Sequence, residues 1–421
     1  MQHKNVPSDN AALTRRRWVV LAACCLANLC IGAVYAWSVF AGPMAEYLNS
    51  IHGTDLNASD LSIAFSIANG IAFLTMIVGG FLDRKIGSRL IIFTGVFAFG
   101  VGYILSGIAK SVAVLVLGFG VISGLANGFA YVCTVSNSVK FFPEKKGMVG
   151  GISTASFGIG SVIVPPIANA LNEAVGVNKA FILLGSAVCV ISFLCYALIV
   201  NCPDGFVPVG CKVTLSDEEG SASDKNTAQM LRDPIFYLML AMLFLGSTLG
   251  LMVISGASDI AQQMLGMSVA SAALVVSAIS LCNTGGRILA GWISDKIGRA
   301  NSIFVVFIAA AVASAATFFS GKLGSSALFC VGICLLGLCY GAFMGIYPGF
   351  TSDRFGLKYS SMNYGVMFIG FSSAGFAGPL LLQAIYNSAG AYNTAFLWAA
   401  ALSVLGVFLT LFYKKAVHSH K

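Results

Sequence analysis

The first long apolar stretch of the chain decides its class of fold. Residues 15–40 read RRRWVVLAACCLANLCIGAVYAWSVF, three arginines followed by a run without a charged residue. A hydrocarbon core about 30 Å thick needs roughly 20 apolar residues in an α-helix, so the run predicts a transmembrane span over residues 18–40. It is too long for the apolar region of a cleavable signal peptide, and we expect it to remain as a full span.

The composition of the whole chain agrees with this interpretation. Of 421 residues, 57% are hydrophobic and only 10% are charged, and the mean hydropathy is +0.87. A soluble domain has about 25% charged residues, because its surface faces water. The charge present here does not suffice for a soluble surface of this size, so we expect most of the surface to face lipid.

Eleven further apolar segments follow, and they predict an all-α, polytopic membrane protein with twelve transmembrane helices. We place the spans at residues 18–40, 61–82, 90–109, 112–138, 148–170, 180–201, 235–257, 269–291, 301–320, 325–347, 363–385 and 393–413. The Pro165-Pro166 pair should bend or shorten the fifth span, because proline removes a helical hydrogen bond.

Basic residues are distributed unevenly between the loops. Of the 24 Lys and Arg residues, 20 lie on one side of the predicted membrane, and only Lys110, Lys179 and Lys322 lie on the other. The positive-inside rule then predicts an integral protein of the cell (inner) membrane with both termini in the cytoplasm. The formal charge of +8 is spread over these loops. It forms no basic patch with interleaved aromatic residues, so we expect no nucleic-acid partner.

Two similar loops lie half a chain apart. Residues 79–89 read GGFLDRKIGSR and residues 291–299 read GWISDKIGR, which places Asp83 and Asp295 at matching positions. A polar segment separates the two sets of six spans. We therefore predict a six-helix half over residues 1–201, a cytoplasmic linker over 202–233, and a second, pseudo-symmetric half over 234–421, an arrangement typical of one large class of transporters.

Groups that could support catalysis or bind metal are sparse. Most of the twelve cysteines fall in apolar runs, where cysteine behaves as a small hydrophobic residue. Cys330, Cys334 and Cys339 share one segment, but no His or carboxylate lies near them, and the four histidines lie in tails or loops. We therefore expect no metal site, no cofactor and no enzymatic activity.

The two loops resemble a signature of the major facilitator superfamily, Gly-x-Leu-x-Asp-Arg-x-Gly-Arg-Arg, and its weaker second copy. The resemblance implies that the loops gate the cytoplasmic side without touching substrate; the alternative is that their charges only orient the chain. In the first copy Asp83 and Gly87 are one residue further apart than usual, so either the second span ends elsewhere or the ion-pair geometry differs. The implied gating residues are Gly80, Asp83, Arg84, Gly87, Arg89, Gly291, Asp295, Lys296, Gly298 and Arg299.

Further segments are similar to the oxalate/formate antiporter family, which lies near the monocarboxylate transporters. They are residues 32–38, 141–147, 231–234, 352–356 and 363–365. This resemblance implies a secondary active or facilitative transporter of small organic anions. Such a protein would work by alternating access in the lipid bilayer, coupled to a proton or an exchanged anion, and we expect it to act as a monomer.

Arg287 is the one Lys or Arg inside a predicted span. A central Arg costs roughly 2.5–3.5 kcal/mol on insertion scales, so such residues are usually functional. Ser277, Ser280, Thr284 and Arg287 fall at helical spacing, and Asn283 lies one turn before the arginine. The pattern favours a wet cavity in which the planar guanidinium binds a carboxylate, the role that the resemblance also implies. The alternatives are snorkelling to the interface and a structural ion pair.

Other spans supply the rest of the predicted site. Asn127, Tyr131, Thr134 and Ser138 share one face of the fourth span, although Thr134 and Ser138 are expected to bond to their own backbone. The resemblance also implies substrate contacts at Tyr131 and at Tyr340. In the first span we assign Tyr35 to the site and a packing role to Trp37, which points the other way. The predicted substrate-binding residues are Arg287, Tyr35, Tyr131, Tyr340, Asn283 and Asn69.

Two departures from the resembled family concern substrate and coupling. Oxalate-specific members carry a Lys in the eleventh span where this chain has Phe371, so we expect a monocarboxylate such as formate, lactate or pyruvate. Proton-coupled carriers of monocarboxylates carry an Asp where this chain has Asn283, and an amide cannot carry a proton. Asp259 is the remaining acidic candidate, although an interfacial role suits it better. Exchange and facilitated diffusion are therefore at least as compatible with the sequence as proton symport.

The sequence is also compatible with other functions. They are an oxalate/formate exchanger, a carrier of drugs or other solutes, and a non-transporting membrane sensor of the same fold. Sugar carriers usually keep several carboxylates in their spans, and drug exporters carry a Gly-Pro signature in the fifth span that residues 158–166 do not match.

Overall fold

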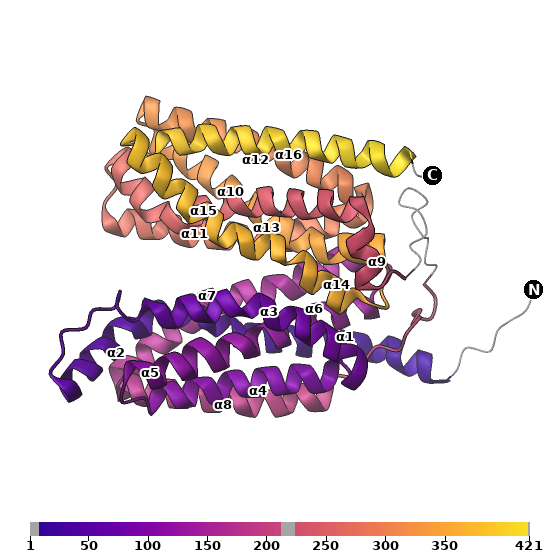
Figure 1. The fold of residues 1–421 in the computed structure, drawn as a ribbon, viewed down its shortest axis with the longest axis horizontal. Coiled ribbons are helices and arrows are strands. Elements are labelled where there is room, and N and C mark those ends of the chain that lie inside the picture. Colours follow the sequence, from indigo (N-terminus) through magenta and orange to yellow (C-terminus); the bar gives the residue numbers. More distant parts are fainter. Residues whose placement is uncertain (1–7, 212–223, 420–421) are drawn as a thin grey trace, which may run out of the picture. The chain divides into compact units, whose positions relative to one another are not determined.

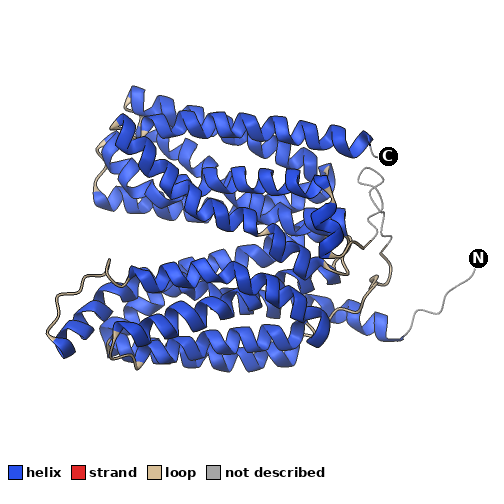
Figure 2. Cartoon of the chain, viewed as in Figure 1, coloured by secondary structure: helices blue, strands red, loops and turns tan. Residues whose placement is uncertain are grey.

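The computed structural model describes residues 8–211 and 224–419. Within these ranges the chain forms helices joined by short loops and contains no strand, as Figure 2 shows. The prediction of an all-α protein is therefore confirmed. Part of the predicted linker, including Lys212 and the acidic run at residues 217–219, lies outside the described residues, as do Lys4 and Lys421.

In the described ranges, twelve helical segments are long and apolar enough to cross a membrane, which confirms the predicted number of spans. The first six are built from α1 (Ser8–Ile31), η1 (Gly32–Ala36) and α2 (Trp37–His52), then α3 (Ser62–Ile86), α4 (Ser88–Gly107), α5 (Val112–Leu115) with η2 (Val116–Ser123) and α6 (Gly124–Phe141), α7 (Lys146–Val175) and α8 (Val177–Leu198). After the short α9 (Thr227–Arg232), the last six are α10 (Pro234–Leu265), α11 (Val269–Ile297), α12 (Arg299–Leu323), α13 (Ser326–Phe355), α14 (Ser360–Met367) with α15 (Ile369–Ala389), and α16 (Asn393–Ser419).

Three spans are not uniform α-helices. The first contains the 3₁₀ segment η1, the fourth contains the π-helical segment η2, and the eleventh is interrupted at Phe368 between α14 and α15. Irregular turns within long helices often mark functional positions, and η1 contains Tyr35. The fifth span, α7, runs through both Pro165 and Pro166 over 30 residues, so the predicted shortening is not observed.

The described chain groups into two compact units. Unit 1 comprises residues Met1–Glu144, Ser156–Val213 and Leu357–Val366, and unit 2 comprises Lys145–Ala155, Thr214–Gly356 and Met367–Lys421. The first turns of α7 therefore belong to unit 2, and nearly all of α14 belongs to unit 1. Figure 1 labels both helices along the chain.

In unit 1, a ridge of small residues on the fourth span packs against α3. A β-carbon added at Gly124 would lie 2.6 Å from the Cα atom of Ala68, and one at Gly128 would overlap the carbonyl oxygen of Ala72. Glycine therefore allows the two backbones to touch, which is how helices associate without a hydrophobic driving force between them. The four-residue spacing of these glycines thus places both contacts on the same face of the fourth span.

In unit 2, α13 packs equally closely against α11. A β-carbon at Gly341 would overlap the carbonyl oxygen of Asn283, and one at Gly345 would overlap that of Arg287. These contacts place the α11 backbone around Arg287 in a fixed position, because neither helix can shift without losing them.

This packing leads to a stability prediction. Gly341→Ala should lower the free energy of unfolding by about 1–3 kcal/mol, because the added methyl group meets backbone rather than a movable side chain. Gly285→Ala on α11 is the matched control, since a β-carbon there meets nothing within 4 Å. Thermal unfolding of both variants in detergent checks the prediction, and an equal Tm for the two would contradict it.

The described end of the predicted linker is anchored on unit 2. Asp233 accepts from Lys225 Nζ at 2.6 Å and from Arg354 Nη2 at 3.3 Å, and its other carboxylate oxygen accepts from the Ile235 backbone N–H. Burial alone would raise the pKa of Asp233. The hydrogen bonds from Lys225 and Ile235 and the charge of Arg354 outweigh burial and hold this pKa below its ordinary value. The carboxylate is thus a stable cap for the start of α10.

Candidate functional site

Arg287 lies where three helical segments of unit 2 meet. Gly345 of α13 and Gly151 of α7 both face its backbone, since a β-carbon at either glycine would overlap the Arg287 carbonyl oxygen. The first turns of α7 and the middle of α13 thereby hold α11 from two sides. The arginine side chain starts from a backbone that cannot easily move.

The Arg287 guanidinium is oriented by two hydrogen bonds. Its Nε donates to Asn283 Oδ1 at 3.3 Å, and its Nη1 donates to the backbone carbonyl oxygen of Thr154 at 2.7 Å. The residue is only 7% exposed. Asn283, one turn earlier on α11, therefore positions the charge, and Thr154 of α7 holds it from a second helix.

Among the described residues, Arg287 enters no ion pair. A structural ion pair therefore does not account for it there, and its burial argues against snorkelling, which would place the guanidinium in water. An arginine side chain carries five N–H donors, and the two hydrogen bonds engage two nitrogens. The arrangement is a buried, oriented cation that can bind an anion.

The polar side chains that precede Arg287 form hydrogen bonds within their own helix. The hydroxyl groups of Ser277, Ser280 and Thr284 each donate to the carbonyl oxygen four residues earlier, at 3.0 Å. These bonds give each hydroxyl a partner within α11, whereas the side chains of Asn283 and Arg287 bond to each other.

An aromatic pair lies in the same unit. Tyr340 of α13 is 6% exposed, and its ring stacks on Phe371 of α15 with centroids 6.4 Å apart. Gly250 of α10 borders the Tyr340 ring so closely that a β-carbon there would overlap it. Phe371 also contacts Phe368, at the break between α14 and α15, with centroids 4.5 Å apart. Phe371, which stands where oxalate-specific members of the resembled family carry a Lys, is thus part of an aromatic cluster.

The predicted site residues of unit 1 gather around one phenylalanine. Tyr35 in η1, which is 39% exposed, and the buried Tyr131 of α6 both contact the ring of Phe157 on α7, with centroids 5.7 Å and 5.2 Å apart. The amide of Asn69, the remaining predicted site residue of this unit, donates to the Phe65 carbonyl oxygen of its own helix at 2.9 Å. Unit 1 therefore contributes an aromatic set of Tyr35, Tyr131 and Phe157.

Two residues of this description were not predicted. Phe157 has no polar group and lies in an apolar run, so nothing in the sequence distinguishes it from the lipid-facing or packing residues around it. Thr154 contributes a backbone oxygen, which residue identity does not reveal. The four-residue spacing of Gly147 and Gly151 was the available signal that α7 approaches another helix closely.

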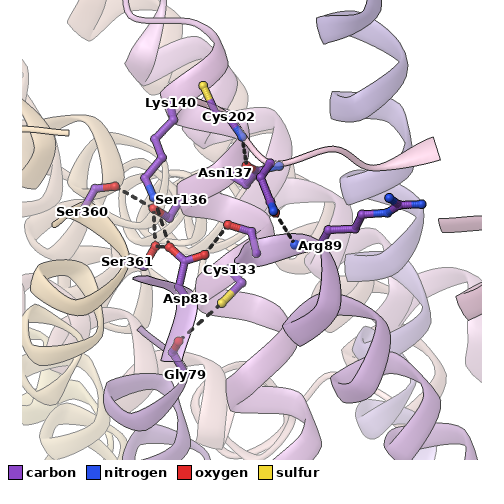
Figure 3. A network of polar contacts seen from close by, with 12 residues as sticks. Gly79, Asp83, Arg89, Cys133, Ser136, Asn137, Lys140, Cys202, Ser360 and Ser361 are labelled. Carbon is purple, nitrogen blue, oxygen red and sulfur yellow. Dashed lines mark hydrogen bonds and ion pairs between the residues drawn. The ribbon is translucent and has the colours of Figure 1, made fainter. Parts of the chain in front are cut away.

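The first loop motif forms a buried polar network in unit 1, drawn in Figure 3. Asp83, at the end of α3, accepts from Lys140 Nζ at 3.0 Å, from Ser361 Oγ at 2.5 Å and from the hydroxyl of Ser88. Ser361 also bonds to Ser136 Oγ at 2.7 Å. The carboxylate therefore ties α3 to α4, α6 and the start of α14.

The second motif forms a denser network in unit 2. Asp295 accepts from the backbone N–H groups of Gly147 and Met148 at 2.8 Å and 2.7 Å, and pairs with Arg299 at 2.7 Å. Arg299 also donates to Asp353 at 2.8 Å, and Lys146 reaches the same carboxylate at 2.6 Å. Asp295 thus caps the N-terminus of α7, where a negative charge is favoured by the helix dipole.

The extra residue in the first motif explains the difference between the networks. Gly298 and Gly87 end α11 and α3 with φ of +87° and +85°, a conformation that suits glycine. Arg299 directly follows Gly298 and pairs with Asp295, whereas Ser88 directly follows Gly87 and bonds to Asp83. Both alternatives left open by the spacing are therefore observed: the end of α3 is shifted and the ion pair differs.

Arg89 is displaced from the Asp83 network as a result. It lies one residue beyond Ser88, about 100° further around the helix. Figure 3 shows its guanidinium pointing away from Asp83, and its Nε donates instead to the Tyr196 carbonyl oxygen at 2.8 Å.

The other motif residues make packing or cation–π contacts near the ends of the same helices. Gly80 leaves room for the backbone of Met362, and Gly291 for that of Gly147. The Arg84 guanidinium lies over the ring of Tyr359, 4.1 Å from its centroid. Lys296 Nζ lies 3.6 Å from the ring centroid of Trp292.

The twelve apolar helices of the described ranges define a polytopic membrane protein, and unit 2 contains a buried, oriented cation. The model of the Major Facilitator Superfamily matches residues 24–379, and the chain belongs to this family. It is 30% identical to an uncharacterised MFS-type transporter of Escherichia coli, YhjX, over 85% of each chain. It is 28% identical to the oxalate:formate antiporter of Oxalobacter formigenes, over 96% of this chain and 93% of that one.

A more distant relative is also a transporter by its name. The chain is 23% identical to human monocarboxylate transporter 12, over 90% of this chain and 77% of that protein. The predicted membership of the oxalate/formate antiporter-like branch is therefore confirmed. Among solved structures, the proton:xylose symporter XylE matches with a TM-score of 0.73 at 14% identity, covering 97% of this chain and 96% of that one. The human organic anion transporter MFSD10 matches with a TM-score of 0.68 at 14% identity, covering 94% and 99%. At such identities the likeness concerns the fold.

Proposed function

We propose that the protein transports small monocarboxylates of the formate, lactate or pyruvate type by alternating access. The observation that supports this most directly is Arg287, a buried cation without an ion pair among the described residues. Its orientation by Asn283 and Thr154 reduces the entropy lost when a carboxylate binds. Each charge-assisted hydrogen bond to the substrate would contribute about 1.5–3 kcal/mol.

The aromatic cluster around Phe371 supports a substrate with one carboxylate. Tyr340, Phe368 and Phe371 offer apolar ring faces and one hydroxyl, but no second cation. An alkyl or keto group would pack there, whereas a second carboxylate would lose its hydration without a matching charge. The exchange of oxalate for formate, suggested by the name of the 28% identical relative, is the second candidate.

Exchange or facilitated diffusion suits the site better than proton symport. Asn283 accepts from Arg287 and has no proton to transfer. Asp259 is exposed on α10 and close enough to Tyr392 to influence its hydroxyl, which suits an interfacial residue. The substrate anion therefore meets an arginine whose charge is available at every physiological pH.

The motif networks would act as locks that open and close during transport. We assign both networks to the cytoplasmic side, with both termini in the cytoplasm and the protein in the cell membrane, because the basic loops lie on that side. Breaking the Asp295 contacts would release the start of α7, whose residue Thr154 holds Arg287. This connection would couple the state of the lock to the orientation of the site.

Counterflow tests the proposed substrate class. Purified protein in liposomes loaded with unlabelled lactate should take up labelled formate, lactate or pyruvate at least about tenfold faster than labelled oxalate, since the second carboxylate of oxalate lacks a partner. Excess pyruvate should compete, and the uncharged analogue lactamide should not. A preference for oxalate, or equal competition by lactamide, would contradict the proposal.

A further inference from the structure

Two arginines from different helices of unit 1 hold the C-terminal end of α8. Arg16 Nη2 of α1 donates to the carbonyl oxygens of Ala197 and Leu198 at 3.2 Å and 3.3 Å. Arg89 Nε of α4 donates to the carbonyl oxygen of Tyr196 at 2.8 Å. The last carbonyls of a helix lack partners within it and attract cations, so these bonds bring both guanidinium groups to one place.

The positive charge gathered there is not neutralised by the described protein. Neither Arg16 nor Arg89 enters an ion pair among residues 8–211 and 224–419, and Asp204, in the loop after α8, pairs with neither. Arg16 is exposed and Arg89 is partly exposed. Among the described residues, their side-chain hydrogen bonds engage one nitrogen of each guanidinium, which carries five N–H donors. The pair can therefore still bind an anion from solvent.

An aromatic and aliphatic surface continues from this pair along α4 and α8, which pack side by side (Figure 1). The Arg89 guanidinium lies over the Tyr196 ring, 4.1 Å from its centroid, and that ring contacts Phe93 with centroids 5.0 Å apart. Phe93 contacts Phe193 in turn, at 5.1 Å. Phe193 is 57% exposed, and Val190, about one turn from it, is 70% exposed.

We propose that this end of α8 binds the headgroup of an anionic phospholipid, with Arg16 and Arg89 on its phosphate and an acyl chain along the surface of Phe93, Phe193 and Val190. The two parts of the surface match the two parts of one amphiphilic molecule. Arginine presents several donors to phosphate oxygens, and basic groups between transmembrane helices attract anionic headgroups. A soluble anion would use only the arginines, so the adjoining apolar surface favours the lipid.

Lipid binding by the full-length protein tests this proposal. Native mass spectrometry of wild-type protein titrated with phosphatidylglycerol should show a retained lipid, with much weaker retention of phosphatidylcholine. The double variant Arg16→Gln and Arg89→Gln should bind phosphatidylglycerol about 10- to 30-fold more weakly, as expected for two basic residues near a headgroup. The matched control is Lys414→Gln with Lys415→Gln, which removes two cations at the end of α16, one of them over the ring of Phe304. It should bind the lipid like the wild type.

Two further measurements separate lipid binding from folding and from free-anion binding. Arg16→Lys with Arg89→Lys keeps both charges and should retain most of the affinity, even if the Gln variant is less stable. Glycerol phosphate should compete only weakly, because it lacks acyl chains. Equal lipid retention by the Gln variant and the wild type would overturn the proposal, and so would competition by glycerol phosphate at the affinity of the lipid.

Discussion

Counterflow of lactate or pyruvate is expected to fall at least about 100-fold when Arg287 is replaced with alanine, because two charge-assisted hydrogen bonds to the carboxylate are lost. The residue is buried, is oriented by Asn283 and Thr154, and has no ion pair in the described ranges. Arg287→Lys keeps the charge but not the planar group that reaches both Asn283 and Thr154, so it should recover only part of the activity. Initial rates in proteoliposomes measure both effects.

The control for this experiment is another arginine. Arg232 lies on α9, is exposed and pairs with no carboxylate in the part of the chain that the structure describes, so Arg232→Gln should transport at nearly the wild-type rate. Thermal unfolding of each variant in detergent separates loss of binding from loss of fold. Unaltered counterflow by folded Arg287→Ala would remove the assignment of Arg287 to the substrate.

The number of spans could be predicted because it follows from local composition, and the same composition singles out Arg287 as a candidate. Each span needs its own run of apolar residues, and a lone cation in such a run has a high cost wherever it lies. Packing between distant segments is different. That Thr154 supplies a carbonyl oxygen to Arg287 depends on how α7 meets α11, and the backbone oxygen of any residue could have done the same.

The loop motifs show a second limit of sequence analysis. The longer interval between Asp83 and Gly87 was visible, but its consequence depends on angles around a helix. It turns Ser88 toward Asp83 and sends Arg89 to the end of α8. Similarly, Ser277, Ser280 and Thr284 each bond within α11, so the wet surface that their stripe predicts stays a prediction. A small hydroxyl has a backbone partner always within reach, so its position on a face does not determine what it contacts.

Replacing Asn283 with aspartate is expected to make transport depend on protons. The introduced carboxylate would lie one turn from Arg287, where the present amide oxygen is 3.3 Å from Nε, and would form the ion pair that the native site lacks. Two unit charges 4 Å apart interact by about 4 kcal/mol at an effective dielectric constant of 20. Such a pair would compete directly with the substrate, so counterflow at pH 7.5 should fall at least about tenfold.

The sign of the pH dependence follows from the same pair. Substrate binding would bring a second negative charge next to the introduced carboxylate, and protonation of that carboxylate would remove the repulsion between the two. Binding would thus take up a proton, and the rate for Asn283→Asp should rise as pH falls toward 5, relative to the wild type at each pH. Asn283→Gln keeps a neutral amide and should show no added pH dependence. Aspartate has the shape of the native asparagine and differs from it in charge, so wild-type rates for Asn283→Asp at pH 7.5 would mean that Arg287 does not bind the substrate carboxylate.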